Sequence, residues 1–413
     1  MSTEDFGSPS AAFAAFAAFG NSAAFAAFGS QAAFAAFGQP QSPMMAEAFL
    51  TNRDGVVGSP LKIRENVPPL QENDPANLAA LSADVRASLW MSELGSRVAI
   101  TAPEHKKGVK ATLWKTDLIG DATPRAEISE VISMVRPTEK QFRQQMKWVS
   151  GYADIRADRA AEILSQVGSP APFYATIAYM DPARTPYTLE LLQAGLRFAN
   201  FVEMQMKYIL AVKRPLEYSP QIQPIIPTPN HGSLPSGHAT EAFLTARLLW
   251  KILRAAAQKP YEDDGYWGEM LMRTAARIAV NRTVAGVHFP VDSAAGALLG
   301  LTVADLIEAE CGGSDTWTSS KFVGPQFGGN DDFDWHALYD AKKDKQCRAS
   351  CGEGHTDIGD ADAAEWWAKD QDHIWAKTRT HQVDGKALNS KPLHWLWKKA
   401  VSEWQDPASR TEG

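Results

Sequence analysis

Long stretches with apolar residues at three- and four-residue steps constrain the fold of this chain most strongly. Apolar side chains recur at this spacing in Pro182–Arg214, and residues 240–258 and 268–280 repeat the pattern. Such steps place side chains on one face of an α-helix. The alternation typical of strands is hard to find. The sequence therefore predicts a mainly α fold, in which these helices form one bundle.

Composition divides the chain into four regions. Residues 1–45 hold a glycine-punctuated array of AAF triplets, residues 46–136 are typical of a linker and an N-terminal region that packs on the bundle, and residues 311–413 are rich in tryptophan. The bundle itself is expected to occupy residues 137–310. We expect the indoles of the last region to pack on the bundle.

The AAF array repeats every nine residues, because GNSAAFAAF at 20–28 is followed by GSQAAFAAF at 29–37. Phe at every third position drifts around a helix of about 3.6 residues per turn, so no clean apolar face forms. This composition predicts a disordered or weakly helical tail. The alternative is a segment for docking or for assembly into a homo-oligomer, since exposed Phe side chains are otherwise a liability.

Charge and hydropathy exclude several classes of protein. A net charge of -7 and a pI near 5.8 argue against nucleic-acid binding, which needs a basic face. The N-terminus is acidic where a secretory signal would be basic, and the longest apolar stretch, 294–304, is shorter than the roughly 20 residues of a membrane span. We therefore expect no signal peptide, no membrane span and a cytoplasmic protein.

The three cysteines cannot form a disulfide framework in a chain of 413 residues, and they favour a reducing compartment. They are Cys311, Cys347 and Cys351. The last two, together with His355, have side chains that can ligate zinc, but the segment lacks an obvious fourth ligand and the usual spacing. An exposed loop with incidental thiols is the preferred interpretation, and a metal site is the alternative.

The first of three polar motifs places Lys207 and Arg214 seven residues apart, directly before Pro215. On a helix this spacing is about two turns, which puts both cations on one face, and Pro215 is expected to end the helix. Two such cations repel each other unless an anion lies between them. The motif indicates a bound oxyanion, and the alternative is a solvated basic helix edge.

The second motif is Pro235-Ser236-Gly237-His238, which opens a helix. Ser236 is placed as the N-cap, Gly237 lets its backbone N–H approach a ligand, and the helix N-terminus favours negative charge. His238 adds a titratable group beside the same anion. The alternative is an ordinary helix cap with a surface histidine.

The third motif runs from Arg282 to His288 and Asp292 and is expected to be a loop feeding a helix, with Pro290 in its first turn. Asp292 lies one turn after His288, so its carboxylate can accept the Nδ1–H of the imidazole and direct Nε2 toward the oxyanion. The alternative is a surface arginine and a capped helix.

Taken in order, the motifs K-x6-RP, PSGH and R-x5-H-x3-D resemble the superfamily of type 2 phosphatidic acid phosphatases (PAP2) and vanadium haloperoxidases. The resemblance covers residues 137–310, and Asn281 departs from it, since the family usually has Ser before the Arg. It implies a helical bundle with the active site at one end. It also implies that vanadate, or phosphate as a competing anion, is held by Lys207, Arg214, Ser236, Gly237, Arg282 and His288.

This superfamily hosts two chemistries. In a soluble acid phosphatase, His288 would be the nucleophile that forms a phosphohistidine, and His238 would protonate the leaving group as general acid. In a vanadium-dependent haloperoxidase, His288 would bind the vanadium of vanadate, Asp292 would orient His288, and His238 would move protons. Such an enzyme oxidises a halide with hydrogen peroxide and halogenates a small organic acceptor.

Three features favour the haloperoxidase. The family's lipid phosphatases mostly span membranes and its small acid phosphatases are generally exported, whereas this chain predicts neither. Residues 148–164 resemble a helical segment of bacterial vanadium haloperoxidase-like proteins. His231 stands where related algal bromoperoxidases have a second histidine, which favours bromide or iodide; the alternative is a solvated loop histidine. Met204 matches neither the chloroperoxidases nor the bromoperoxidases, so the halide preference stays open.

A third hypothesis makes this an assembly protein, with an anion cage that is vestigial or only binds phosphate and a Phe-rich tail that makes the contacts. The complete set of cations argues against it, because losing any one would leave a buried anion undercompensated.

Overall fold

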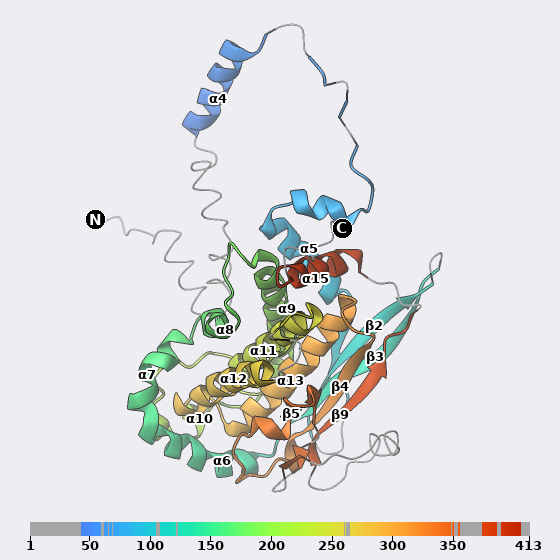
Figure 1. Ribbon diagram of the computed structural model, residues 1–413. Helices are drawn as coiled ribbons and strands as arrows, with labels where there is room; N and C mark the ends of the chain where they lie inside the picture. The colour runs from blue at the N-terminus through green and yellow to red at the C-terminus, as the bar shows by residue number, and fades with distance from the viewer. Residues whose placement is uncertain are drawn as a thin grey trace, which may run out of the picture.

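The computed structural model describes residues 43–58, 62–64, 66–67, 69–104, 108–120, 123–259, 261, 265–347, 349–350, 354–355, 374–385 and 390–405 (Figure 1). The AAF array, Cys351, Trp366 and Trp367 lie outside these residues, so the predictions made for them are not tested. The boundaries of the four predicted regions likewise stay predictions.

Helices account for most of the regular structure in this part of the chain. They are α4 (Pro43–Val56), α5 (Ala83–Gly95), α6 (Glu139–Gly151), α7 (Arg156–Ser165), α8 (Ala171–Ala178), α9 (Pro186–Leu210), α10 (Pro215–Tyr218), α11 (Gly237–Ala255), α12 (Tyr266–Val284), α13 (Pro290–Glu310) and α15 (Lys391–Ser402). Short 3-10 helices are η1 (Pro75–Ala80), η2 (Tyr152–Ile155), η3 (Pro220–Ile222), η4 (Gly324–Gln326) and η5 (Trp335–Ala337). The long periodic stretches of the sequence correspond to α9, α11 and α12.

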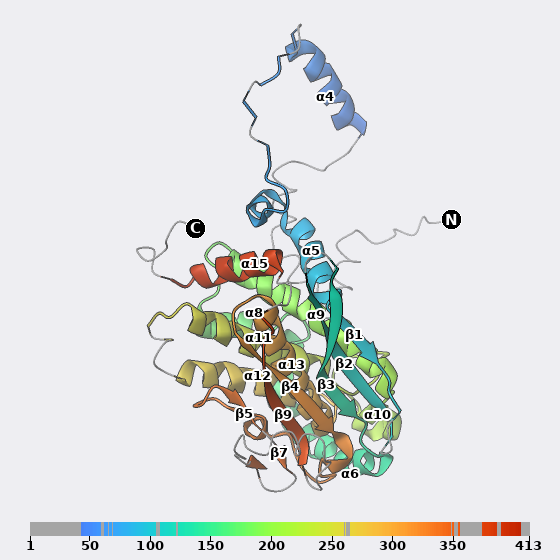
Figure 2. The same cartoon turned by 90° about the vertical axis from the view of Figure 1, so that its right-hand side faces the viewer.

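The prediction of a mainly α bundle was wrong, because a mixed sheet covers one side of the helices (Figures 1 and 2). Its strands, in spatial order, are β1 (Val98–Thr101), β2 (Lys110–Ile119), β3 (Arg125–Val135), β4 (Thr316–Val323), β9 (Ile374–Gln382), β7 (Ala349–Ser350) and β8 (Gly354–His355). Strands β3 and β4 pair in parallel, and the other neighbours are antiparallel. A separate hairpin joins β5 (Tyr339–Asp340) to β6 (Lys345–Gln346).

Strands β2 and β3 were missed because burial does not alternate along them. In β3 the first four residues are exposed and the last five are all buried, so one half faces water on both sides and the other half faces protein on both sides. In β2 three consecutive residues are buried in the same way. Alternation of apolar and polar residues marks only strands with one wet face.

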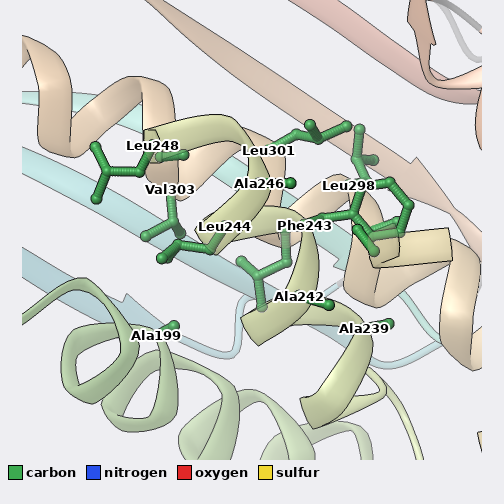
Figure 3. Close-up of a cluster of buried hydrophobic side chains, with 14 of the residues drawn as sticks. Ala199, Ala239, Ala242, Phe243, Leu244, Ala246, Leu248, Leu298, Leu301 and Val303 are labelled. Carbon is green, nitrogen blue, oxygen red and sulfur yellow. The ribbon is translucent and has the colours of Figure 1, made fainter. Parts of the chain in front are cut away.

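Helix α13 is the centre of the fold and is buried along its whole length. It contacts α11 on one side and β4 on the other, which joins the helical layer to the sheet. Phe243, Leu244 and Leu248 of α11 and Leu298 and Leu301 of α13 belong to the core cluster around this contact (Figure 3).

Two glycines allow α11 and α13 to approach closely. A Cβ on Gly296 would lie 2.9 Å from the Cβ of Ala239, and one on Gly300 would lie 2.8 Å from the backbone nitrogen of Leu244. Because these distances are shorter than van der Waals contact, any side chain here would push the helices apart. This close crossing sets the position of the N-terminus of α11.

By length and composition, α13 is also the one helix in the described residues that could cross a membrane, and the apolar window that qualifies it is completely buried within the protein. It is longer than the apolar stretch recognised in the sequence, since Asp305 and Glu308 are included. Asp305 makes an ion pair with Arg247 at 2.9 Å.

The C-terminal helix α15 packs on α9 and α5. Trp397 and Trp404 are buried, and Trp395 stacks on Trp90 at 6.4 Å between ring centroids. The prediction that indoles of this region pack on the rest of the fold is confirmed for these residues. Glu403 also accepts the backbone N–H groups of the first turn of α9, at 2.7 and 2.8 Å.

Candidate anion-binding site

Lys207 and Arg214 do not lie on one face of a helix, so that prediction was wrong. Helix α9 ends at Leu210, because Ala211 takes a left-handed conformation with φ 47°. Arg214 then stands directly before α10, and Pro215 begins that helix where it was expected to end one. The two cations nevertheless lie near each other, since each lowers the pKa of His231 and of His288.

Arg214 reaches across to the third motif. Its Nη1 lies 2.9 Å from Nε2 of His288 and donates to the carbonyl of Val287 at 2.8 Å. Because a guanidinium can only donate hydrogen bonds, Nε2 of His288 must be the unprotonated nitrogen. His288 therefore presents a lone pair at Nε2.

The other nitrogen of His288 faces a carboxylate, as predicted. Nδ1 lies 3.1 Å from Oδ2 of Asp292, which also accepts the backbone N–H of Phe289 at 2.9 Å. Ser233 donates its hydroxyl to the same oxygen and lies 3.3 Å from Nδ1. Burial raises the pKa of Asp292 to about 6, although these hydrogen bonds favour its charged form. The arrangement holds the Nδ1–H tautomer of His288.

The N-terminus of α11 is capped as predicted, since the hydroxyl of Ser236 accepts the backbone N–H of Ala239 at 3.4 Å. The side chain of Lys207 donates to the carbonyls of Pro235 and, at 3.4 Å, Gly232, which ties the end of α9 to the second motif. The first N–H groups of a helix have no carbonyl partner within it, so this end of α11 favours negative charge.

His238 follows the cap and has one partnered ring nitrogen. It hydrogen-bonds the backbone of Gln166, whereas its Nε2 is buried without a partner among the described residues. Burial first, and then Arg282 and Lys207, lower its pKa to about 3. Both cations therefore lie near this ring.

Arg282 lies in the last turn of α12 and not in a loop, which corrects the reading of the third motif; the loop covers only residues 285–289. Its Nη2 donates to the carbonyl of Ile163 at 3.2 Å and to Oε1 of Gln166 at 3.3 Å. Its Nε and Nη1 are buried and have no partner in the described residues. Leaving such donors unpaired is costly, so they mark a place for an anion.

Burial disfavours the charged form of all three cations. It lowers the pKa of Lys207 to about 8 and those of Arg214 and Arg282 to about 10. At neutral pH they still carry charge, although their side chains are almost wholly buried. A multiply charged oxyanion would offset this desolvation.

Sequence reasoning missed Gln166, which is 2% exposed and is the C-cap of α7. Its backbone holds His238, and its side-chain oxygen also accepts from Nδ2 of Asn281 at 2.8 Å. Asn281, the position that departs from the family pattern, thus supports Gln166. Nothing in the local sequence marks Gln166, because its partners lie on α11 and α12.

A second missed residue, Arg156, holds the loop of the third motif. It donates to the carbonyl of Val284 at 2.7 Å and to those of Ile222 and Gln223 at 2.8 and 2.9 Å. The left-handed Gly286, at φ 85°, leaves room for this guanidinium, since a Cβ there would lie 2.6 Å from Nη2. These hydrogen bonds of Arg156 fix the backbone that carries His288.

His231 lies at the mouth of the site. Its carbonyl accepts from Nε of Arg214 at 3.1 Å, and its Nδ1 lies 3.2 Å from Nη2 of the same residue. Burial, with Lys207 and Arg214, lowers its pKa to about 4. An open cavity of about 540 Å³ begins here, and its lining combines apolar surface with the polar side chains of Lys213, Arg214, Glu217, Thr228, Asn230 and His231.

All of the predicted site residues lie in one segment of the chain, and this segment matches a known family. The family model of the PAP2 superfamily matches residues 190–307. This segment, called the PAP2 region below, is similar to that superfamily. A comparison with curated proteins found no match. The PAP2 region spans Lys207 through Asp292, whereas Gln166 and Arg156 lie before it.

The described residues contain no group of three or more His, Cys, Asp or Glu side chains that could hold a metal ion. The Cys347–His355 segment is not tested as a zinc site, because Cys351 lies outside them. An oxyanion needs no such cluster, since arginine, lysine and backbone donors bind its oxygens. The unpartnered nitrogens of Arg282 and His238 fit that donor set.

Proposed function

We propose that the PAP2 region is a vanadium-dependent haloperoxidase that oxidises bromide or iodide with hydrogen peroxide. The observation that supports it best is the set of buried nitrogens without a partner among the described residues: Nε and Nη1 of Arg282 and Nε2 of His238. Nε2 of His288, which is unprotonated and accepts from Arg214, completes the set. These atoms, beside two further cations, suit a tetrahedral oxyanion.

In this proposal Nε2 of His288, which now accepts from Arg214 at 2.9 Å, would be the ligand to vanadium, and Asp292 would keep the proton on Nδ1. Lys207, Arg214 and Arg282 would neutralise the vanadate oxygens, and the N-terminus of α11 would offer them the backbone N–H of Gly237 and the hydroxyl of Ser236. The backbone N–H of Ser236 is already donated to the carbonyl of Asp292 at 2.9 Å. When bound, vanadate supplies the Lewis-acidic centre that activates hydrogen peroxide toward halide.

Halide oxidation by hydrogen peroxide consumes one proton for each hypohalous acid and water formed. His238 is placed to carry it, because its free Nε2 can take up a proton while Nδ1 stays bound to the backbone of Gln166. An anion beside Arg282 and Lys207 would raise the low pKa of this imidazole. Proton transfer by His238 would thus depend on the bound oxyanion.

The contact of His231 with Arg214 favours the haloperoxidase over the phosphatase. A histidine at this position is a feature that the chain shares with the related algal bromoperoxidases. Here its Nδ1 lies 3.2 Å from Nη2 of Arg214, one of the proposed anion-binding residues. The adjoining cavity of about 540 Å³ is large enough for a small organic acceptor.

The test is a paired assay on the full chain, with and without vanadate. We expect bromination of an organic acceptor in the presence of vanadate, bromide and hydrogen peroxide, and its loss in His288→Ala. The exposed His336→Ala serves as the control and should keep activity. Hydrolysis of an aryl phosphate without vanadium, and no bromination, would assign the same residues to a phosphatase, with His288 as nucleophile and His238 as general acid.

A further inference from the structure

A buried carboxyl group, Glu203, lies against the candidate anion site. It is on α9, one turn before Lys207, and is 1% exposed. A Cβ on Gly237 would lie 2.7 Å from its Oε1 and 3.2 Å from its Oε2. A side chain at position 237 would therefore displace the carboxyl group of Glu203.

Glu203 has very few partners for a buried acid. Its Oε1 receives one long hydrogen bond, 3.5 Å, from Nδ2 of Asn200, and its Oε2 has none among the described residues. An ionised carboxylate with so little hydrogen bonding is costly to bury. Burial accordingly raises its pKa to about 7, although Lys207 and Arg214 act in the opposite direction.

The charged groups around Glu203 come from three elements. Lys207 is on the same helix, Arg214 stands at the start of α10, and Glu241 lies in the second turn of α11. Glu241 is 6% exposed, and its pKa is raised well above the usual value by burial and by Glu203. The two carboxyl groups therefore disfavour ionising together.

An oxyanion at the N-terminus of α11 would be repelled by an ionised Glu203, since both would stand beside Gly237. We propose that Glu203 couples oxyanion binding to the uptake of one proton, so that the site accepts its anion only when Glu203 is neutral. This inference rests on the proposed anion site. The protonation state of Glu203 would then decide whether the protein binds the anion.

The experiment measures the affinity of the full chain for vanadate, and separately for inorganic phosphate, in wild type and Glu203→Gln. Comparing the two proteins at each pH cancels the ionisation of the ligand itself. The ratio of wild-type to variant Kd should be near one in mild acid. Above the pKa of Glu203 it should rise by up to about tenfold per pH unit.

Two further variants sharpen the test. Glu127→Gln, on the exposed part of β3, should behave as wild type at every pH. If Glu241→Gln removes the pH dependence and Glu203→Gln does not, the proton belongs to Glu241 and the inference is overturned. Calorimetry in two buffers of different ionisation enthalpy should show one more proton taken up by wild type than by Glu203→Gln above neutral pH.

The outcomes separate this inference from the proposed function. Binding of vanadate with a ratio of Kd values that stays constant with pH overturns the role of Glu203 and leaves the anion site intact. No binding of vanadate or phosphate by either protein at any pH overturns the anion site and this inference with it.

Discussion

Nη1 of Arg214 lies 2.9 Å from Nε2 of His288, although the two residues are 74 positions apart in the chain. Since arginine cannot accept a hydrogen bond, this contact and the one from Nδ1 to Asp292 together determine where the imidazole carries its proton. His288 is thereby prepared to act as a ligand or as a nucleophile without first losing a proton.

Asp292→Asn should weaken the preference of His288 for the tautomer with its proton on Nδ1. An amide can donate as well as accept, so His288 can take the wrong tautomer, and we expect turnover or vanadate affinity to fall about 10–100-fold. Ser233→Ala, which removes one of the other hydrogen bonds to the same carboxylate, should have a smaller effect. Steady-state kinetics with thermal unfolding as a control for folding would check this, and unchanged kinetics in Asp292→Asn would contradict it.

His238→Ala should lower turnover more than it lowers vanadate affinity. A group that moves protons acts chiefly in the transition state, so we expect a loss of about 10²–10⁴-fold in kcat. Affinity should change little, because Lys207, Arg214 and Arg282 remain. Equilibrium binding measured beside kcat would decide, and a variant that loses only binding would refute the role given to His238.

The buried His238 should also destabilise the anion-free protein in acid. Its folded pKa of about 3 lies below the unfolded value of about 6.5, so the unfolded chain binds more protons between these limits and stability falls as the pH drops below 6.5. At pH 5 this amounts to about 2 kcal/mol relative to pH 7. Urea unfolding of wild type and His238→Gln at both pH values should show that difference, and equal losses would disprove it.

Gly296→Ala should disturb the anion site from a distance. The new methyl group would come within 2.9 Å of the Cβ of Ala239, so α11 must move and carry Ser236 with it. Overpacking of this kind costs about 1–3 kcal/mol. Gly151→Ala, at the end of α6 where no atom lies within 4 Å, is the matched control and should be close to neutral. Chemical denaturation and vanadate binding would measure both effects.

Gln166→Leu should lower activity although Gln166 itself makes no proposed contact with the oxyanion. It removes the acceptor shared by Asn281 and Arg282, which leaves Arg282 free to turn away from His238. We expect a loss of about 10–100-fold in affinity or turnover, as for other residues that support a ligand. The exposed Gln221→Leu should retain wild-type values. Normal affinity in Gln166→Leu would show that Arg282 holds its place unaided.

The helices and motifs were predictable because their signals are local. The period of the apolar residues placed α9, α11 and α12, and the residue types of the second motif placed the N-cap at Ser236. The sheet was not predictable in this way, because β3 is exposed on both faces at one end and buried on both at the other, and β2 has three consecutive buried residues. Neither stretch carries the alternation that marks a strand.

The sequence by itself determined the features that depend on neighbours within one or two turns: the cap of α11, Pro290 in the first turn of α13, and the contact of His288 with Asp292 four residues on. Tertiary structure alone decided that Arg214 leaves the helix of Lys207 to meet His288, that Gln166 holds His238, and that Glu203 lies against Gly237. These contacts join residues from different elements. Their geometry follows from how closely α9, α11 and α13 pack, and no local pattern encodes that distance.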